Sequence, residues 1–283
     1  MGGQATSERD ELLAFELGLD ERVCDEVRRE SWGRLFLSPS LPLIWDANWA
    51  AIEDVGLGLA EVVAVAEEAL GGAGCAHRTV GVLDAAQGRA LGERMEADAV
   101  AWPGWEVERN RYMVWRGGDA TSSQKSSDSD EKCERGGGGV REARLAEIEA
   151  LRRRLIGESM PPAVDEFEAT VDQLLAQERR YGAAAGDRWF ASPAAGEPLS
   201  ACCLFRRDGI AQVEEVATRR DARGRGHAKA VVLAAVAAAM AAGDRTVFLT
   251  ADAADWPQLM YAELGFETVG DITILRRAPA RST

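Results

Sequence analysis

The sequence predicts a mixed α+β protein with two domains, each combining helices with a mixed α/β sheet. Three observations predict this class. Segments with strand and helix periodicity alternate through both halves of the chain. With 46% hydrophobic and 28% charged residues, the 283-residue chain has the balance of a globular protein. A polar, glycine-rich stretch interrupts this pattern near the middle of the chain.

The interruption covers residues 117–139 and reads GGDATSSQKSSDSDEKCERGGGG. Such a stretch buries too little apolar surface to offset the entropy lost on ordering, so it predicts a flexible linker. We therefore expect an N-terminal α/β domain over residues 1–116 and a second domain over residues 140–283.

The elements of the N-terminal domain follow from periodicity and residue type. Val63, Ala66 and Leu70 lie on one side of a helix, whereas residues 77–83 have the β-branched content of a strand. The predicted elements are helices at 10–15, 20–29, 52–70 and 85–95, and strands at 77–83 and 106–115.

The C-terminal domain is predicted in more detail. Apolar stripes predict helices over residues 143–155 and 164–175, and Asp208-Gly209 is typical of a hairpin turn. Further helices are expected at 227–242 and 256–263, and strands at 188–191, 199–205, 212–218, 246–250, 266–269 and 272–276.

Charge and cysteine content exclude several function classes. The formal net charge of −14 repels phosphates, so we expect no nucleic-acid partner. The five cysteines include no CxxC pair, and Cys202 and Cys203 would point to opposite faces of a strand. We expect free thiols in a cytoplasmic protein and, with only two histidines, no metal.

The sequence also predicts no association with a membrane. Its first residues lack a basic segment followed by an apolar one, so we expect no signal peptide. The longest apolar run, residues 228–242, is mostly alanine and contains Lys229. It is too short and too weakly hydrophobic to span a bilayer.

The candidate site for chemistry is the glycine-rich turn at residues 219–228, between a predicted strand and a long helix. This arrangement aims backbone N–H groups and the positive end of a helix at one spot, as a pyrophosphate requires. Glycine permits the anion to approach the backbone closely. A P-loop string is absent, and the dinucleotide fingerprint fails because Lys229 takes its last glycine position.

Arg223-x-x-Gly226-x-Ala228 instead resembles the pyrophosphate loop of the GNAT acetyltransferase superfamily, Arg/Gln-x-x-Gly-x-Gly/Ala. Residues 261–266 then resemble the tyrosine motif of that family, Tyr-x-x-x-Gly-Phe, in the usual order and spacing. The resemblance covers residues 140–277 and is strongest over 212–266. It implies a GNAT fold that binds acetyl-CoA as cosubstrate.

The resemblance also implies roles for individual residues. Exposed N–H groups on the strand would bind the pantetheine arm, and one would polarise the thioester carbonyl, at Val216, Ala217 or Thr218. The pyrophosphate would be held by Arg223, Gly224, Arg225, Gly226, His227 and Ala228. Tyr261 would protonate the departing thiolate, since a phenol of pKa about 10 can donate to a thiolate whose conjugate acid has pKa about 8.5.

The attacking amine must lose a proton, and two glutamates are candidate bases. In a regular strand Glu215 and Ala217 share one face, whereas Glu214 lies on the other with Val216 and Thr218. Glu215 is the preferred base. The alternatives are a water relay, or a glutamate that is solvated or paired with Arg206 or Arg207.

The N-terminal domain echoes the second in its strand–helix–strand order. The chain is therefore expected to be a tandem GNAT protein with a degenerate first copy, because Gly56-Leu57-Gly58 lacks the loop arginine. The first strand of the second domain is either very short, at residues 140–141, or supplied by residues 112–116.

Two functions fit these features. The preferred one is an N-acetyltransferase acting on the primary amine of a small molecule or an aminoacyl group. The alternative is a non-catalytic acyl-CoA sensor with the N-terminal domain as its output. They differ at Tyr261, since Tyr261→Phe should lower turnover in an enzyme but leave the CoA affinity of a sensor intact. Acceptor identity and oligomeric state are left open.

Overall fold

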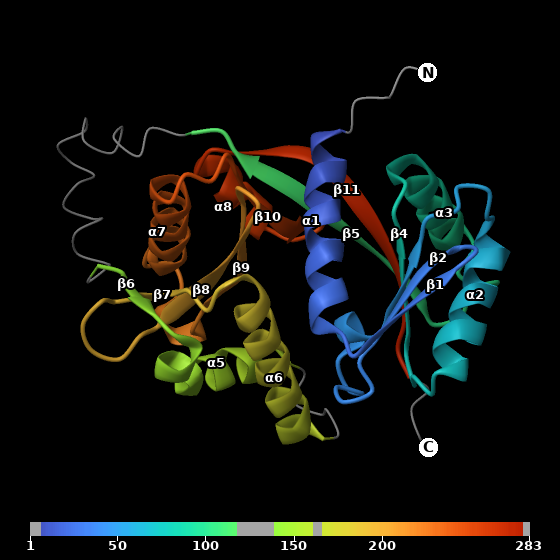
Figure 1. Cartoon of the computed structure of the whole chain (residues 1–283), viewed down its shortest axis with the longest axis horizontal. Coiled ribbons are helices and arrows are strands. Elements are labelled where there is room, and N and C mark those ends of the chain that lie inside the picture. The colour runs from blue at the N-terminus through green and yellow to red at the C-terminus, as the bar shows by residue number, and fades with distance from the viewer. Residues whose placement is uncertain (1–6, 118–138, 161–165, 280–283) are drawn as a thin grey trace. The chain divides into compact units, whose positions relative to one another are not determined.

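A computed structural model describes residues 7–117, 139–160 and 166–279 of the chain (Figure 1). The chain forms two compact units, neither continuous in sequence. Unit 1 comprises Met1–Tyr112, Ala251–Asp255 and Val269–Thr283; unit 2 comprises Met113–Thr250 and Trp256–Thr268. The boundaries of these units differ from the expected domain boundaries at residues 116 and 140, because residues 251–255 and 269–283 belong to unit 1. The linker expected at 117–139 falls almost entirely outside the described residues.

Unit 1 contains a mixed sheet with helices packed on it. Strands β1, β2 and β3 are antiparallel, β3 and β4 are parallel, and β4 is antiparallel to the end of β11. Apolar residues of α2 and α3 pack with those of β2, β3 and β4 in one buried core. In chain order the elements are α1 (Glu8–Val23), β1 (Glu26–Glu30), β2 (Gly33–Leu37), η1 (Trp45–Ala47), β3 (Trp49–Ile52), α2 (Leu59–Gly72), β4 (Arg78–Val82), α3 (Ala85–Ala97) and β5 (Trp105–Trp115).

The strands of unit 2 also run in mixed directions. Strands β6, β7, β8 and β9 are antiparallel neighbours, and β10 is parallel to β9. Within this unit α5 and α6 cover one face of the sheet and α7 covers the other (Figure 1). The elements are β6 (Arg141–Ala143), α5 (Leu145–Ser159), α6 (Phe167–Ala185), β7 (Trp189–Ser192), β8 (Ser200–Arg207), β9 (Ile210–Thr218), η3 (Arg220–Ala222), α7 (His227–Ala241), β10 (Thr246–Asp252), α8 (Pro257–Glu263) and β11 (Phe266–Arg277).

Several elements differ from the sequence-based expectation. The helix expected at residues 20–29 is instead the end of α1 followed by β1, because Val27 pairs with Phe36 across a hairpin. The helix expected at 52–70 begins only at Leu59, after the buried strand β3. The expected strands at 266–269 and 272–276 form the single strand β11.

The hairpin turn expected at Asp208-Gly209 is confirmed. Asp208 has φ of 53° and Gly209 has φ of 78°, the pair of positive values that a two-residue type I′ hairpin needs. The structure also decides which of the two expected segments, residues 140–141 or 112–116, forms the first strand of unit 2. It is the very short β6, which pairs with β7, while the last residues of β5 from Met113 onward also belong to unit 2.

The chain contains an internal repeat of its topology. The order α1-β1-β2-β3-α2-β4-α3-β5 recurs as α6-β7-β8-β9-α7-β10-α8-β11. The parallel pair falls at the same place in each copy, β3 with β4 and β9 with β10. The echo expected from the sequence therefore extends over eight elements, and β6 and α5 precede the second copy alone. No helix within the described part of the chain has the length and apolarity of a membrane span.

Candidate functional site

Strand β9 departs from regular pairing at its centre. Cys203 of β8 pairs with Glu214, but the next pair toward the end of β9 is Ala201 with Ala217. Cys202 therefore faces two residues, Glu215 and Val216, which is the arrangement of a β-bulge. Because paired residues point to the same side, Glu214 and Ala217 share a face. The expectation that Ala217 shares a face with Glu215 was wrong, since it assumed unbroken alternation.

Beyond the bulge, β9 has no ladder with β10. The parallel pairs are Thr246–Ile210, Val247–Ala211 and Phe248–Gln212, and there the ladder ends. Both strands nevertheless continue, β9 to Thr218 and β10 to Asp252. The strands thus separate toward the end of β9, and its edge at the partly exposed residues Val216, Ala217 and Thr218 carries backbone groups that an extended ligand can pair with.

The turn after β9 leads into α7 with an open helix start. Gly224 has φ of 74° and Gly226, the N-cap of α7, has φ of 83°. No side chain caps α7 and no acidic residue lies in its first turn. The first intrahelical bond runs from the N–H of Ala230 to the carbonyl of Gly226, at 3.0 Å. The N–H groups of the three residues between them therefore point outward, toward any anion at this end.

Cationic side chains surround this helix start. Arg223 donates through Nε to the carbonyl of Thr218 at 3.3 Å, and both Arg223 and Arg225 are exposed. Within the described ranges neither arginine forms an ion pair. Arg219, by contrast, is paired with Glu197 and Asp221. The site therefore holds two positive charges that the surrounding residues do not neutralise.

The side chain of His227 takes part in packing. It is 4% exposed, and its Nδ1 lies 2.9 Å from Oγ of Ser192. Burial, reinforced by the charge of Arg225, lowers the pKa of His227, so the ring favours its neutral form. Its backbone N–H stays at the helix start, as the sequence led us to expect.

Glu214 is the carboxylate with the most perturbed environment on β9. Its Oε1 accepts hydrogen bonds from Nε2 of Gln212 at 2.7 Å and from Oγ1 of Thr250 at 3.1 Å. Burial and the neighbouring charge of Glu215 raise the pKa of Glu214 to about 7. A carboxyl group in this state exchanges its proton near neutral pH, as a general base must.

Tyr261 lies within electrostatic reach of Glu214. It is 7% exposed and packs edge-on against Phe266, with ring centroids 6.1 Å apart. Burial, followed by the charge of Glu214, raises the pKa of Tyr261 well above its usual value. The phenol is therefore held protonated, which is the form a proton donor requires.

Glu215 has a different environment from Glu214. Its side chain is 45% exposed, and its Oε2 lies 2.5 Å from a guanidinium nitrogen of Arg152. Arg206 pairs with Asp244 and Arg207 with Asp208, so the partner of Glu215 is an arginine that sequence reasoning did not consider. No local pattern could have identified Arg152, because it lies 63 residues away on α5.

The corresponding place in unit 1 is closed. Strands β3 and β4 stay paired to the end, through Ile52–Val82 and the bond from the N–H of Leu83 to the carbonyl of Ile52. The N–H of Gly56 is bound by the carboxylate of Asp54, at 2.8 Å. The N–H of Gly58 is bound by that of Glu61, at 2.7 Å. Asp54 and Glu61 thus bind N–H groups of the turn before α2, and Glu61 places a negative charge in the first turn of that helix, which disfavours an anion there.

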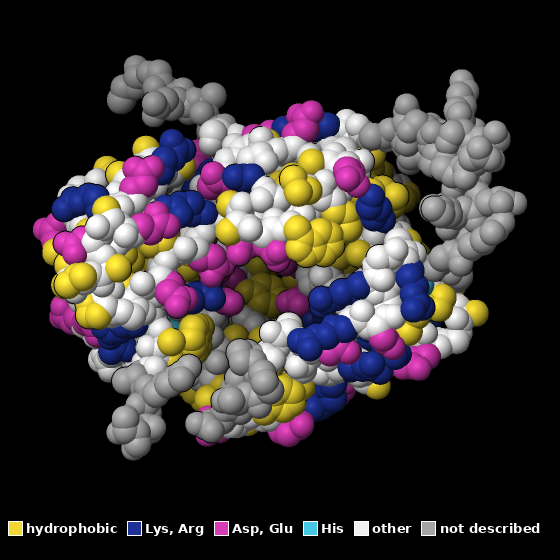
Figure 2. Space-filling view, turned by 180° about the vertical axis from the view of Figure 1, so that it is seen from behind, with side chains coloured by type: hydrophobic (Ala, Val, Ile, Leu, Met, Phe, Trp, Pro, Cys, Tyr) yellow, Lys and Arg dark blue, Asp and Glu magenta, His cyan; other side chains and the backbone are white. Residues whose placement is uncertain are grey.

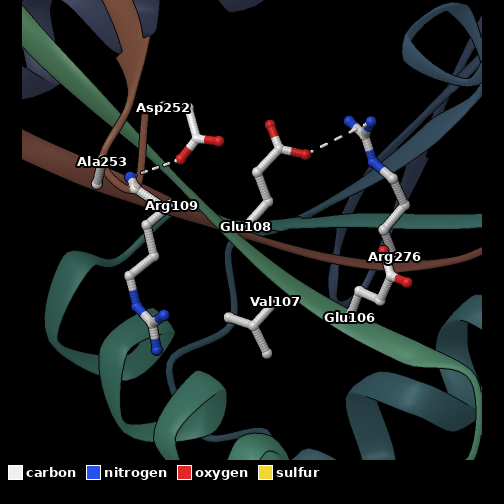
Figure 3. A pocket seen from close by; sticks show the side chains of 8 residues that line it. Glu106, Val107, Glu108, Arg109, Asp252, Ala253 and Arg276 are labelled. Atoms are coloured by element: carbon white, nitrogen blue, oxygen red, sulfur yellow. Dashed lines mark hydrogen bonds and ion pairs between the residues drawn. The ribbon is translucent and has the colours of Figure 1, made fainter. Parts of the chain in front are cut away.

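Unit 1 does contain a cavity of about 480 Å³, lined by Glu106, Val107, Glu108, Arg109, Asp252, Ala253, Ala254 and Arg276 (Figure 3). Its arginines are engaged by acidic neighbours. Arg109 binds both carboxylate oxygens of Glu96 at 2.7 Å, and Arg276 binds Asp46 at 2.7 Å. Over the face shown in Figure 2, acidic and basic side chains are likewise interspersed. The residues that line the cavity include no helix start, and both of its arginines are paired.

Comparison with known proteins agrees with this geometry. The sequence model of the acetyltransferase (GNAT) family matches residues 152–266, which include β9, the turn, α7, β10 and α8. A GCN5-related N-acetyltransferase from Kribbella flavida is 17% identical, with 98% of each chain covered and a TM-score of 0.60. A functionally unknown conserved protein from Staphylococcus epidermidis is 12% identical, with 92% of this chain and 96% of that chain covered and a TM-score of 0.63. No curated protein matches the sequence.

At these identities the structural likeness establishes the fold, and it extends over both units. The family match begins within α5 and then covers the second copy of the repeat, the one with the open site, as far as Phe266. The chain has a GNAT fold, and its residues 152–266 form a GNAT acetyltransferase domain.

Proposed function

We propose that this chain is an acetyl-CoA-dependent N-acetyltransferase, which transfers the acetyl group directly to the primary amine of a small molecule or an aminoacyl group. One observation carries the proposal. The separated edge of β9 leads through a short turn into the start of α7, beside Arg223 and Arg225, which form no ion pair with other residues that the structure describes. An extended arm that ends in a pyrophosphate matches this combination of hydrogen-bonding edge and anion site.

The residues present fit the cosubstrate in two regions. The N–H groups at the edge formed by Val216, Ala217 and Thr218 would pair with the pantetheine arm. The pyrophosphate would lie at the turn and helix start, held by Arg223, Gly224, Arg225, Gly226, His227 and Ala228. Bound acetyl-CoA would supply an activated thioester carbonyl.

The chain's own residues then handle the protons. We propose Glu214 as the base in place of Glu215, because its pKa of about 7 suits proton removal from an ammonium group near neutral pH. Glu215 is instead engaged by Arg152. Tyr261, held protonated by burial and by the charge of Glu214, would donate its proton to the departing thiolate. A backbone N–H at the bulge would stabilise negative charge on the carbonyl oxygen.

The glycine at the helix start offers a specific test of the anion site. Gly226→Ala places a side chain at φ of 83°, which strains the turn and moves the N–H groups of α7. We expect the Kd for CoA, measured by calorimetry, to rise about tenfold or more.

The matched control is Gly243→Ala, just beyond the other end of α7. Gly243 has φ of 84°, and an added Cβ there, as at Gly226, would meet no atom within 4 Å. Both changes should lower the free energy of unfolding by a similar amount, about 1 kcal/mol. Only Gly226→Ala should weaken CoA binding, and equal affinities in the two variants would remove the anion site from this turn.

Binding stoichiometry tests the difference between the two copies. Because Asp54 and Glu61 bind the N–H groups of the turn before α2 and the strands of unit 1 stay paired, we expect one CoA per chain. Isothermal titration with acetyl-CoA should give a single class of site. Two equivalent sites would contradict the closed state of unit 1.

A thiol-release assay with acetyl-CoA and a panel of amines tests the function itself. Acceptor-dependent release of CoA, together with an acetylated amine detected by mass spectrometry, is the expected result. Binding of acetyl-CoA without release in the presence of any amine would favour the sensor. Absence of CoA binding would contradict both functions.

A further inference from the structure

The backbone of Glu215 adopts an unusual conformation at the centre of the site. Its φ of 57° lies in the left-handed region, where a residue with a Cβ is strained. Glycine takes this region without cost, yet the sequence has a glutamate. Residues in such a conformation persist only where the surrounding structure holds them.

The group in contact with Glu215 is Arg152, and it is firmly fixed. Its side chain is 2% exposed, and its guanidinium lies 4.9 Å from the centre of the Trp189 ring. The same guanidinium pairs with the buried carboxylate of Glu178 on α6. Burial alone would lower the pKa of Arg152, but the charges of Glu215 and Glu178 raise it, so the arginine stays charged.

In this ion pair the arginine is the fixed partner and Glu215 is the residue that it holds. Glu178 and Trp189 hold the arginine from α6 and β7, and its Nη2, which also donates to Glu178, reaches Oε2 of Glu215 at 2.5 Å. Glu215 in turn stands between Glu214 and Val216, the carboxyl group and the strand edge that the proposed reaction uses. A shift of the backbone at Glu215 therefore moves both neighbours.

We propose that Arg152 is a positioning residue, which holds the bulge of β9 in its left-handed conformation through the side chain of Glu215. This role rests on the proposed function. Arg152 does not touch the reacting atoms. It sets where the N–H of Val216 and the carboxylate of Glu214 point.

The test compares two replacements of Glu215. Both remove the carboxylate and its pair with Arg152, but only glycine tolerates the left-handed conformation. We expect Glu215→Ala to lower kcat about tenfold and Glu215→Gly to stay within about threefold of the wild type. In both variants the limb of the pH–rate profile that reports Glu214 should move to lower pH by the same amount, because the same charge is removed.

Two further variants complete the design. Arg152→Lys keeps a charge for Glu178 but loses the guanidinium geometry in which Nη2 donates to Glu178 and Glu215 together, so it should lower kcat like Glu215→Ala and add nothing when combined with it. Glu142→Ala removes an exposed glutamate of β6, which pairs with Arg188, and should leave kcat unchanged. If Arg152→Lys fails to fold, the two Glu215 variants decide.

The outcomes distinguish failure of the positioning role from failure of the proposed function. Binding of acetyl-CoA and turnover are first measured on the wild-type chain, and failure there overturns the proposed function and the role of Arg152 together. Given activity, equal and nearly complete loss in Glu215→Ala and Glu215→Gly would make Glu215 the base and overturn the positioning role. Full activity in both variants would show that the bulge keeps its conformation without the pair between Glu215 and Arg152, which would also overturn the positioning role.

Discussion

Tyr261→Phe is expected to lower kcat about 10²-fold or more, the usual contribution of a positioned proton donor. The ring is buried and packs on Phe266, so phenylalanine preserves the packing and removes only the hydroxyl group. The Kd for acetyl-CoA should change little. Steady-state kinetics with the best amine of the panel, alongside calorimetry, measures both quantities.

The matched control is Tyr181→Phe. Tyr181 lies on α6 and stacks on Phe205, with ring centroids 5.4 Å apart, and has no proposed part in the reaction. Its replacement should leave kcat within about twofold of the wild type. If Tyr261→Phe turns over as fast as this control, the thiolate receives its proton from elsewhere, and the donor role of Tyr261 is wrong.

Glu214→Gln is expected to lower kcat/KM by about 10²-fold at pH 8, because glutamine cannot accept the proton of the amine. In the wild type the base works only when deprotonated. Since burial and the charge of Glu215 raise the pKa of Glu214 to about 7, activity should fall as the pH drops through this value. The variant should lose that limb of the profile. Persistence of the limb in Glu214→Gln would assign it to another group.

The same variant has a second readout in stability. Because the folded-state pKa of Glu214 is raised above its ordinary value of 4.5, the folded protein favours the protonated form. Its contribution to stability is therefore present at low pH and is lost as the pH rises to about 7. Glu214→Gln should raise Tm relative to the wild type at pH 8 but not at pH 4. Glu267→Gln, an exposed position on β11, should show no such dependence.

Local sequence patterns predict a large part of this structure. The hairpin at Asp208-Gly209, the helix after Gly226 and the family of the C-terminal half follow from turn residues, apolar spacing and short motifs. Such features are encoded in contiguous residues, so the sequence predicts them. Strands β1 and β3 were missed, because neither shows strict alternation on its own.

The chemistry of the candidate site depended more on tertiary structure. By itself the sequence determined the GNAT fold of the second copy, the glycine turn at residues 223–228 and the tyrosine at 261. Only the tertiary structure shows the bulge at Glu215, the ion pair of that glutamate with Arg152 and the raised pKa of Glu214. The physical reason is that register, burial and ion pairing arise between β9 and the elements packed against it, and Arg152 and Glu215 stand 63 residues apart in the chain.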